Sequence, residues 1–167
     1  MSGTFRVAVS KDYLTFASAH FITFRGHRCE ALHGHNYRVG ITVEGAVDPE
    51  CNFVVDFAVL KQIVKPLVDA IDHRVILPTE NPKLAIAADE ERVTVHYQGE
   101  PRYVFPRSDC ALLPILNSTA EMLAEYLARQ VCDGLRARGV SGLARMTIEV
   151  EESPGQSASF ELIPSGP

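Results

Sequence analysis

Apolar and polar residues alternate over 33–44, a pattern that predicts a strand with one buried face. Tyr37 and Val39 share one parity, and polar side chains stand at many of the positions between. His33 and His35 continue the apolar parity at the start of this run. Because residues i and i+2 of a strand point to the same side, we expect both imidazoles on the core side, with Cα atoms roughly 6.6 Å apart.

The same alternation predicts further strands towards both ends of the chain. Strands are expected over 5–9, 13–20, 146–150 and 158–162, with a hairpin formed by 92–97 and 102–105.

Two stretches have the alternating three- and four-residue spacing of an amphipathic helix. The first covers 57–71 and follows Asp56, a good N-cap, but Pro66 lies inside it and should kink or divide the helix. The second covers 123–135 and follows a capping-box pattern over 118–121. The order of strands, helix, hairpin, helix and strands predicts an α+β fold, with the helices on one face of an antiparallel sheet.

Composition and charge narrow the class of protein. A chain of 167 residues fits a single domain, 1–167, and a net charge of −5 without a basic patch argues against nucleic acid or a membrane surface as partner. The start of the chain lacks the apolar core of a signal peptide, and no apolar run spans a membrane, so we expect a cytoplasmic protein with reduced thiols. Cys51, Cys110 and Cys132 are expected to be small core residues.

The histidines are candidate ligands of a metal ion. His33 and His35 can converge on one Zn²⁺ at Zn–N distances of about 2.0–2.1 Å. A catalytic zinc commonly has three protein ligands and one open position. The expected third ligand is His20, which ends an extended segment after the small residues 17–19. His27 is the alternative, but it lies in a loop where a solvated histidine is ordinary.

Cys29 stands four residues before His33, and two interpretations stay open. As a fourth ligand it would close the site and make the metal structural. As a free thiol near a metal it would be a general acid or base, because nearby positive charge lowers a thiol pKa. Its neighbours Arg28 and Glu30 are unfavourable for a residue of the core.

Two carboxylates are also candidates for chemistry. Asp72 stands beside His73 at the end of the first predicted helix, where it could orient the imidazole, although exposed pairs of this kind are common. Glu152 keeps the buried parity of 146–150 and therefore needs a partner. A ligand with a guanidine-like edge would be such a partner, held by two parallel hydrogen bonds. The alternative is that the strand ends before Glu152 and the side chain is solvated.

Several stretches of the chain together resemble one known protein family. They are 16–20, 29–37, 56–57 with 60–61, 67–73, 117–121 with 123–124, and 150–152. These stretches are similar to the 6-pyruvoyl-tetrahydropterin synthase and 6-carboxy-tetrahydropterin synthase family. The resemblance covers most of the chain outside about 78–112, and its most specific part is the set of three histidines with the preceding cysteine.

The resemblance implies a fold, an assembly and a set of site residues. The fold would be the tunnelling T-fold, a four-stranded antiparallel sheet with two helices on one face, here with an inserted hairpin segment around 78–112. Subunits of that fold form homo-oligomers, here trimers stacked as a hexamer, with active sites at the interfaces. The implied site comprises zinc ligands His20, His33 and His35, proton-transfer residues Cys29, Asp72 and His73 (the last two from a neighbouring subunit), and pterin-binding residues Glu152 and Thr119.

The implied substrate is 7,8-dihydroneopterin triphosphate. The spacing of Cys29 and His33 is similar to that of the 6-carboxy-tetrahydropterin synthases of the queuosine pathway, so we expect this zinc-dependent lyase activity. The alternatives are a 6-pyruvoyl-tetrahydropterin synthase, a divergent zinc enzyme acting on a pterin or purine, and a binding module with a structural metal. The chain departs from the family pattern at Ala120, where a Thr or Ser is frequent, and in the insertion, which follows Asp72 and His73 and could cover or reshape the site.

Overall fold

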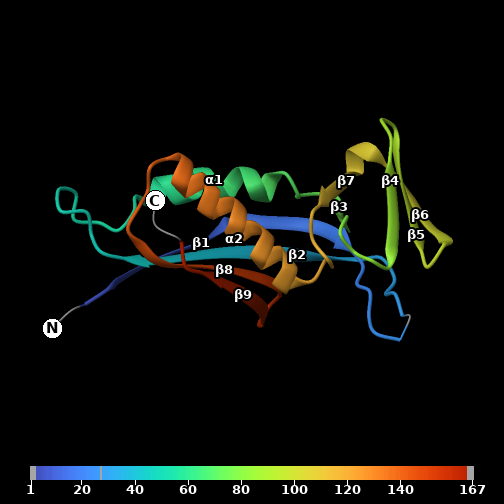
Figure 1. Ribbon diagram of the computed structural model, residues 1–167, viewed down its shortest axis with the longest axis horizontal. Helices are drawn as coiled ribbons and strands as arrows, with labels where there is room; N and C mark the ends of the chain where they lie inside the picture. Colours follow the sequence, from blue (N-terminus) through green and yellow to red (C-terminus); the bar gives the residue numbers. More distant parts are fainter. Residues whose placement is uncertain (1–2, 27, 165–167) are drawn as a thin grey trace.

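We describe the protein from a computed structural model, which covers residues 3–26 and 28–164. The elements in chain order are β1 Phe5–His20, β2 His33–Gly45, α1 Phe57–Asp69, β3 Arg74–Pro78, β4 Leu84–Ala88, β5 Arg92–Tyr97, β6 Glu100–Pro106, the 3-10 turn Arg107–Asp109, β7 Cys110–Leu113, α2 Ala120–Ala137, β8 Leu143–Ser153 and β9 Gln156–Leu162. Figure 1 shows both helices on the same side of the long strands and a small second sheet at one end.

The main sheet has the strand order β7-β3-β1-β2-β8-β9 within the described residues. Four consecutive strands of this sheet, β1, β2, β8 and β9, pair with one another in antiparallel fashion, as expected from the sequence. The expectation of only four strands is wrong, because β3 and β7 extend the sheet beyond β1 as parallel strands. The extension begins at His73, whose amide donates to the carbonyl oxygen of Ala17 on β1 at 2.7 Å. This hydrogen bond places the following strand, β3, beside β1.

The first strand is longer than the sequence predicts. Two extended pieces were expected over 5–9 and 13–20, whereas β1 runs unbroken from Phe5 to His20. The pairing of β1 with β2 shifts its register between Ser10 and Thr15. This irregularity accounts for the break in the alternating pattern without ending the strand.

Both helices lie where the apolar spacing predicts them. The carboxylate of Asp56 caps α1 by accepting a hydrogen bond from the amide of Ala58 at 2.7 Å. The helix is not divided at Pro66 but continues to Asp69. The cap of α2 is Thr119 rather than the first residue of the predicted box, Ser118, whose hydroxyl instead donates to the carbonyl oxygen of Phe21.

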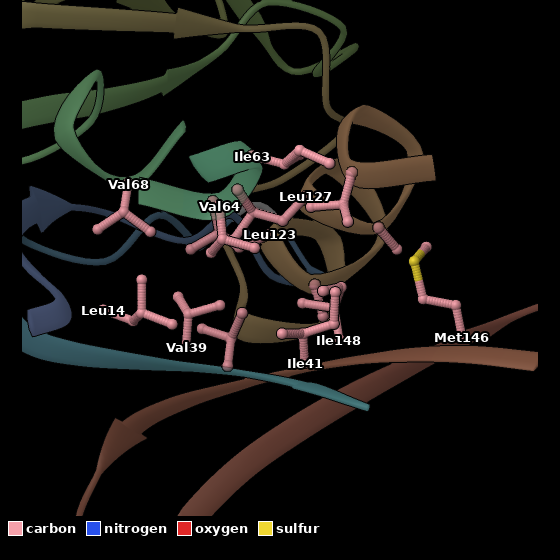
Figure 2. Close-up of a cluster of buried hydrophobic side chains, with 14 of the residues drawn as sticks. Leu14, Val39, Ile41, Ile63, Val64, Val68, Leu123, Leu127, Met146 and Ile148 are labelled. Atoms are coloured by element: carbon pink, nitrogen blue, oxygen red, sulfur yellow. The ribbon is translucent and has the colours of Figure 1, made fainter. Parts of the chain in front are cut away.

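The main core lies between the two helices and one face of the sheet. Figure 2 shows this packing, with labelled side chains from β1, β2 and β8 (Leu14, Val39, Ile41, Met146, Ile148) facing those of the helices (Ile63, Val64, Val68, Leu123, Leu127). Each fully buried aliphatic side chain stabilises the fold by about 1.5–3 kcal/mol relative to exposure. Cys110 and Cys132 are buried as expected, but Cys51 is exposed, contrary to the prediction, because it lies in the turn after β2.

Residues 78–112 form more than the predicted hairpin. β5 and β6 are the two expected hairpin strands, and β4 adds a third strand on the other side of β5. This small sheet has its own core, in which Val93, Val95 and Cys110 of the insertion pack with Phe21 and Leu77 from outside it. No helix in the described part of the chain has both the length and the apolar character needed to cross a membrane.

Candidate metal centre

Three histidines meet where β1 ends and β2 begins. His20 and His33 are direct partners in the antiparallel register, and His35 lies two residues further along β2. The ring centroids are 4.6 Å apart for His20 and His33, 5.3 Å for His20 and His35, and 4.9 Å for His33 and His35. One nitrogen from each ring lies within 4.8 Å of the others, so the structure brings together the three residues that the sequence singled out.

Hydrogen bonds fix the orientation of each ring through its Nδ1 atom. The three contacts are His20 Nδ1 with the Ser118 carbonyl oxygen at 2.7 Å, His33 Nδ1 with the Ala31 carbonyl oxygen at 3.0 Å, and His35 Nδ1 with Ser153 Oγ at 3.3 Å. A carbonyl oxygen only accepts, so Nδ1 of His20 and of His33 carries the proton and Nε2 keeps its lone pair. This is the arrangement of metal-binding histidines, in which an outer partner holds the tautomer and the ring angle.

His20 fits a metal ligand by its burial as well. Its side chain is fully buried, and its Nε2 atom has no hydrogen-bond partner. Burial lowers the pKa of His20, which favours the neutral ring that can bind a cation. Glu152 Oε1 lies 3.2 Å from this Nε2 atom and 3.4 Å from His35 Nε2. Three neutral imidazole nitrogens are a donor set that zinc accepts, so the three histidines fit a zinc ion.

Gly34 allows the two strands to approach closely between the ligands. A Cβ atom at this position would lie 3.1 Å from the backbone oxygen of Ser18 on β1. A larger residue would therefore push β1 and β2 apart between His33 and His35.

Glu152 lies inside β8, which continues to Ser153. Its side chain therefore faces the histidines rather than solvent, in agreement with its buried parity. The hydroxyl of Tyr37 donates to Glu152 Oε1 at 3.2 Å. Burial and the nearby carboxylate raise the pKa of Tyr37, so the phenol stays protonated as a donor.

Cys29 lies in the segment between β1 and β2 and is partly buried. It is absent from the described group of residues whose ligand atoms lie within 4.8 Å of one another. This favours the free-thiol interpretation over a fourth ligand. Burial raises the pKa of Cys29, and the positive charge of Arg102 opposes that shift. His27, the alternative third ligand, lies outside the described residues.

Asp72 and His73 lie in the turn after α1, as predicted. Asp72 Oδ1 accepts a hydrogen bond from the amide of Ala17 at 2.8 Å and lies 2.9 Å from His73 Nδ1. The hydrogen bond from the Ala17 amide, and to a smaller extent the contact with His73, holds the pKa of Asp72 below its usual range. Both Asp72 and His73 line a hollow together with Asn36 and Glu151, and His73 also lines a neighbouring hollow that His35 borders. On β2, Asn36 has the opposite parity to His33 and His35, so its side chain points to the other face of the sheet.

Thr119 lies next to Ser118, whose carbonyl oxygen holds His20. Its hydroxyl accepts the amide hydrogen bond of Met122 at 3.4 Å as the cap of α2, and the hydroxyl hydrogen remains available to a ligand. Ala120, where a hydroxyl residue is frequent, is the buried first residue of the helix.

Sequence reasoning missed Glu30 as well as the supporting residues Tyr37, Ser118 and Ser153. Glu30 Oε2 is buried without a hydrogen-bond partner and lies 3.8 Å from His33 Nδ1. Its position between Cys29 and His33 is the only signal that the sequence offers. Neither interpretation of Cys29, as a fourth metal ligand or as a free thiol that transfers protons, assigns a role to the Glu30 carboxylate.

Comparisons with known proteins agree with this geometry. The sequence profile of a family described as 6-pyruvoyl tetrahydropterin synthase matches residues 8–162. A candidate 6-carboxy-5,6,7,8-tetrahydropterin synthase of Methanocaldococcus jannaschii is 35% identical over 147 residues, which cover 88% of this chain and 89% of that protein.

Solved structures give the same result. The 6-pyruvoyl tetrahydropterin synthase of Plasmodium falciparum has a TM-score of 0.87 at 32% identity, covering 97% of this chain and 99% of its own. A Plasmodium vivax variant of that enzyme, in which a glutamate described as a catalytic residue is replaced by alanine, has a TM-score of 0.86 at 29% identity, with the same coverage. The architecture of this chain is thus the T-fold, as the resemblance implied.

Proposed function

Because this chain belongs to the 6-pyruvoyl tetrahydropterin synthase family, we propose that it is a zinc-dependent pterin lyase acting on 7,8-dihydroneopterin triphosphate. The proposed reaction is that of a 6-carboxy-5,6,7,8-tetrahydropterin synthase. The observation that carries the proposal is the convergence of three imidazole nitrogens, one from each of three rings whose Nδ1 has a partner, beside a carboxylate.

His20, His33 and His35 would hold the zinc. When bound, zinc supplies a Lewis acid that polarises oxygen atoms of the substrate side chain. The three rings are already oriented by Ser118, Ala31 and Ser153, so binding requires little reorganisation of the protein. The described cluster contains three protein ligands, which leaves room for the substrate in a tetrahedral site.

Glu152 would anchor the pterin ring. A carboxylate can accept two parallel N–H groups from the guanidine-like edge of a pterin. Tyr37 donates to Oε1 and fixes the carboxylate in place. Thr119, at the start of α2, would line the same pocket through its hydroxyl.

Cys29 would move a proton to or from the substrate, with Asp72 and His73 of a neighbouring subunit as partners. Asp72 holds His73 by the 2.9 Å contact and would stabilise its charged form. Within one chain Asp72 lines a hollow that none of the three cluster histidines lines, although His73 and His35 both border the neighbouring hollow. This separation supports a homo-oligomer, a trimer or hexamer, in which one chain completes the site of another.

We propose a cytoplasmic protein of the queuosine (7-deazapurine) pathway. The spacing of Cys29 and His33 supports the pathway. All four cysteines have free thiols, which supports a reducing compartment.

The test is incubation of the zinc-loaded protein with 7,8-dihydroneopterin triphosphate and identification of the product by chromatography and mass spectrometry. We expect a 6-carboxy pterin, which keeps one side-chain carbon. A 6-pyruvoyl pterin, which keeps three and is trapped by adding a reductase, would assign the other branch. Absence of both products would overturn the proposal.

A 6-pyruvoyl-tetrahydropterin synthase is the second candidate, favoured by one observation. The Plasmodium vivax enzyme has a glutamate described as a catalytic residue, and Glu30 of this chain places a buried carboxylate oxygen 3.8 Å from His33 Nδ1. If Glu30 serves this reaction, Glu30→Gln abolishes formation of the 6-pyruvoyl product and leaves that of the 6-carboxy product unchanged.

A further inference from the structure

Two neighbouring residues of β6, Arg102 and Tyr103, contact the backbone of the segment that carries Cys29. Arg102 Nη2 donates to the carbonyl oxygen of Glu30 at 2.7 Å and lies 3.4 Å from that of Cys29. The amide of Leu32 donates to the hydroxyl of Tyr103 at 3.1 Å. The insertion therefore holds this segment at three backbone groups that are adjacent to the metal ligands.

The side chain of Cys29 meets the same insertion. It packs against the small core that includes Val93 and Val95 of β5 and Cys110. The segment thus contacts the insertion through both its main chain and its thiol-bearing side chain, and Thr23 forms a backbone bridge with Cys29.

Arg102 and Tyr103 are themselves fixed in position. The ring of Tyr103 lies 5.2 Å from that of Phe21 and is stacked 5.4 Å from that of Phe105. The guanidinium of Arg102 lies over the rings of Tyr103 and Tyr97, at 5.2 Å and 5.9 Å. Aromatic and cation–π contacts of this kind restrict a long side chain that would otherwise sample many rotamers.

Buried polar atoms without partners gather at this segment. Within the described residues they are His20 Nε2, Glu30 Oε2 and Arg102 Nε. Such atoms are rare in native proteins and mark sites where function or an absent ligand explains them. Arg102 contributes one of these atoms although it comes from the insertion, and its guanidinium contacts the carbonyl oxygen of Glu30.

We propose that Arg102 and Tyr103 are positioning residues that hold the Cys29–Leu32 segment, and so fix the thiol of Cys29 relative to the three histidines. The proposal rests on the catalytic role of Cys29 proposed above. In this arrangement the insertion acts on the site indirectly, through its hydrogen bonds to the Cys29–Leu32 segment. His20 and His33 are placed by the pairing of β1 with β2, and the carbonyl oxygen of Ala31, inside this segment, holds Nδ1 of His33.

Hydrogen–deuterium exchange tests the contact without any substrate. The variants are Arg102→Met, Arg102→Lys and Tyr103→Phe, with Arg92→Met, an exposed arginine on β5 of the same sheet, as control. We expect exchange of the Leu32 amide to rise about tenfold in Tyr103→Phe, because that change removes its acceptor. We expect a similar rise in Arg102→Met, because the segment loses the donor to the carbonyl oxygens of Cys29 and Glu30 and moves more freely. The Arg102→Lys variant should keep part of the protection, since an amine still donates there. Excess zinc in all assays keeps the ligands occupied, because Ala31 of the same segment holds Nδ1 of His33.

Kinetics test the consequence for Cys29. We expect Arg102→Met to lower kcat by about 10- to 100-fold while KM stays within about twofold, because misplacement of a reacting group affects the chemical step. In a Cys29→Ala background, Arg102→Met should cause no further fall, since both changes act through the same thiol.

The outcomes separate the two proposals. Unchanged exchange in Arg102→Met and Tyr103→Phe would overturn the positioning role, whatever the turnover. Raised exchange with an unchanged kcat, or a further fall in the Cys29→Ala background, would also overturn it. Raised exchange in a protein that makes neither pterin product would refute the proposed function and leave the physical contact established.

Discussion

Glu152 Oε1 lies 3.2 Å from Nε2 of His20, in a contact that lacks hydrogen-bond geometry. The Nδ1 proton of His20 is engaged by Ser118, so the two facing atoms are a nitrogen lone pair and a carboxylate oxygen. These atoms repel unless a proton or a metal ion lies beside them. The contact is therefore an electrostatic argument for a bound cation at this position.

Replacement of one ligand should remove the metal. We expect His20→Ala to lower zinc affinity by more than about 100-fold, because even the outer partners of ligands contribute about 10- to 100-fold. Metal analysis by mass spectrometry after dialysis measures this directly. His96→Ala, on β5 and outside the described cluster, should keep the zinc content of the unmodified protein. A full complement of zinc in His20→Ala would refute the assignment.

The stability of the metal-free protein should fall at acid pH. Burial lowers the pKa of His20 below its ordinary value of 6.5. The unfolded chain therefore takes up a proton at higher pH than the folded chain, so the free energy of unfolding is highest above pH 6.5 and decreases below it.

The slope from this one group is at most about 1.4 kcal/mol per pH unit. Urea unfolding at several pH values measures the slope, and His20→Gln should flatten it. An identical pH dependence in both proteins would show that His20 does not contribute.

Removal of the Cys29 thiol should separate binding from turnover. We expect Cys29→Ala to lower kcat by about 10²- to 10⁴-fold, the usual contribution of general acid–base catalysis. Zinc content and pterin binding should remain, because the thiol is outside the described ligand cluster. Cys51→Ala, an exposed cysteine, is the matched control. Loss of zinc in Cys29→Ala would instead support its role as a ligand.

Mixed oligomers should test whether two chains share one site. Cys29→Ala and His73→Ala should each be nearly inactive alone. After the two proteins are unfolded together and refolded, we expect part of the activity to return, because some interfaces pair an intact Cys29 with an intact His73. Refolding each variant alone is the control, and a mixture without recovered activity argues for a site within one chain.

The charge of Glu152 should determine substrate affinity. Glu152→Gln removes the charge and one of two acceptor oxygens, so we expect KM to rise about 10- to 100-fold, the worth of a charge-assisted hydrogen bond. Glu149→Gln, on the same strand but exposed on the opposite face, is the control. Steady-state kinetics with the pterin substrate give both constants, and equal KM values in the two variants would exclude the anchoring role.

Strands in which apolar and polar residues alternate regularly were predictable from the sequence, because one face of each strand packs on the core. The β3 strand was not, since it is short and lies between two others, so its sequence shows no alternation. The cap of α2 was misplaced by one residue because Ser118 bonds to Phe21, a partner 97 residues away that no local pattern reveals. The extension of β1 through 10–15 was hidden by its change of register.

The ligands of the candidate site were predictable from chemistry and spacing, but their supports were not. His20 is held by the backbone oxygen of Ser118, which any residue type would offer. Arg102 reaches backbone oxygens in the same way. Such contacts depend on the tertiary path of the chain and leave no signature in the identity of the acceptor residue.

The register of β2 has a further consequence for the length of the chain. His33, His35 and the core residues of β2 share one side of the strand, because successive side chains point to opposite faces. Insertion or deletion of a single residue between His35 and Gly45 would turn either the histidines or the core residues towards the open face. Changes in length are therefore tolerated only outside this strand, as in the turn over 46–52 or in the insertion between β3 and β7, where the chain can grow without disturbing the phase of the metal ligands.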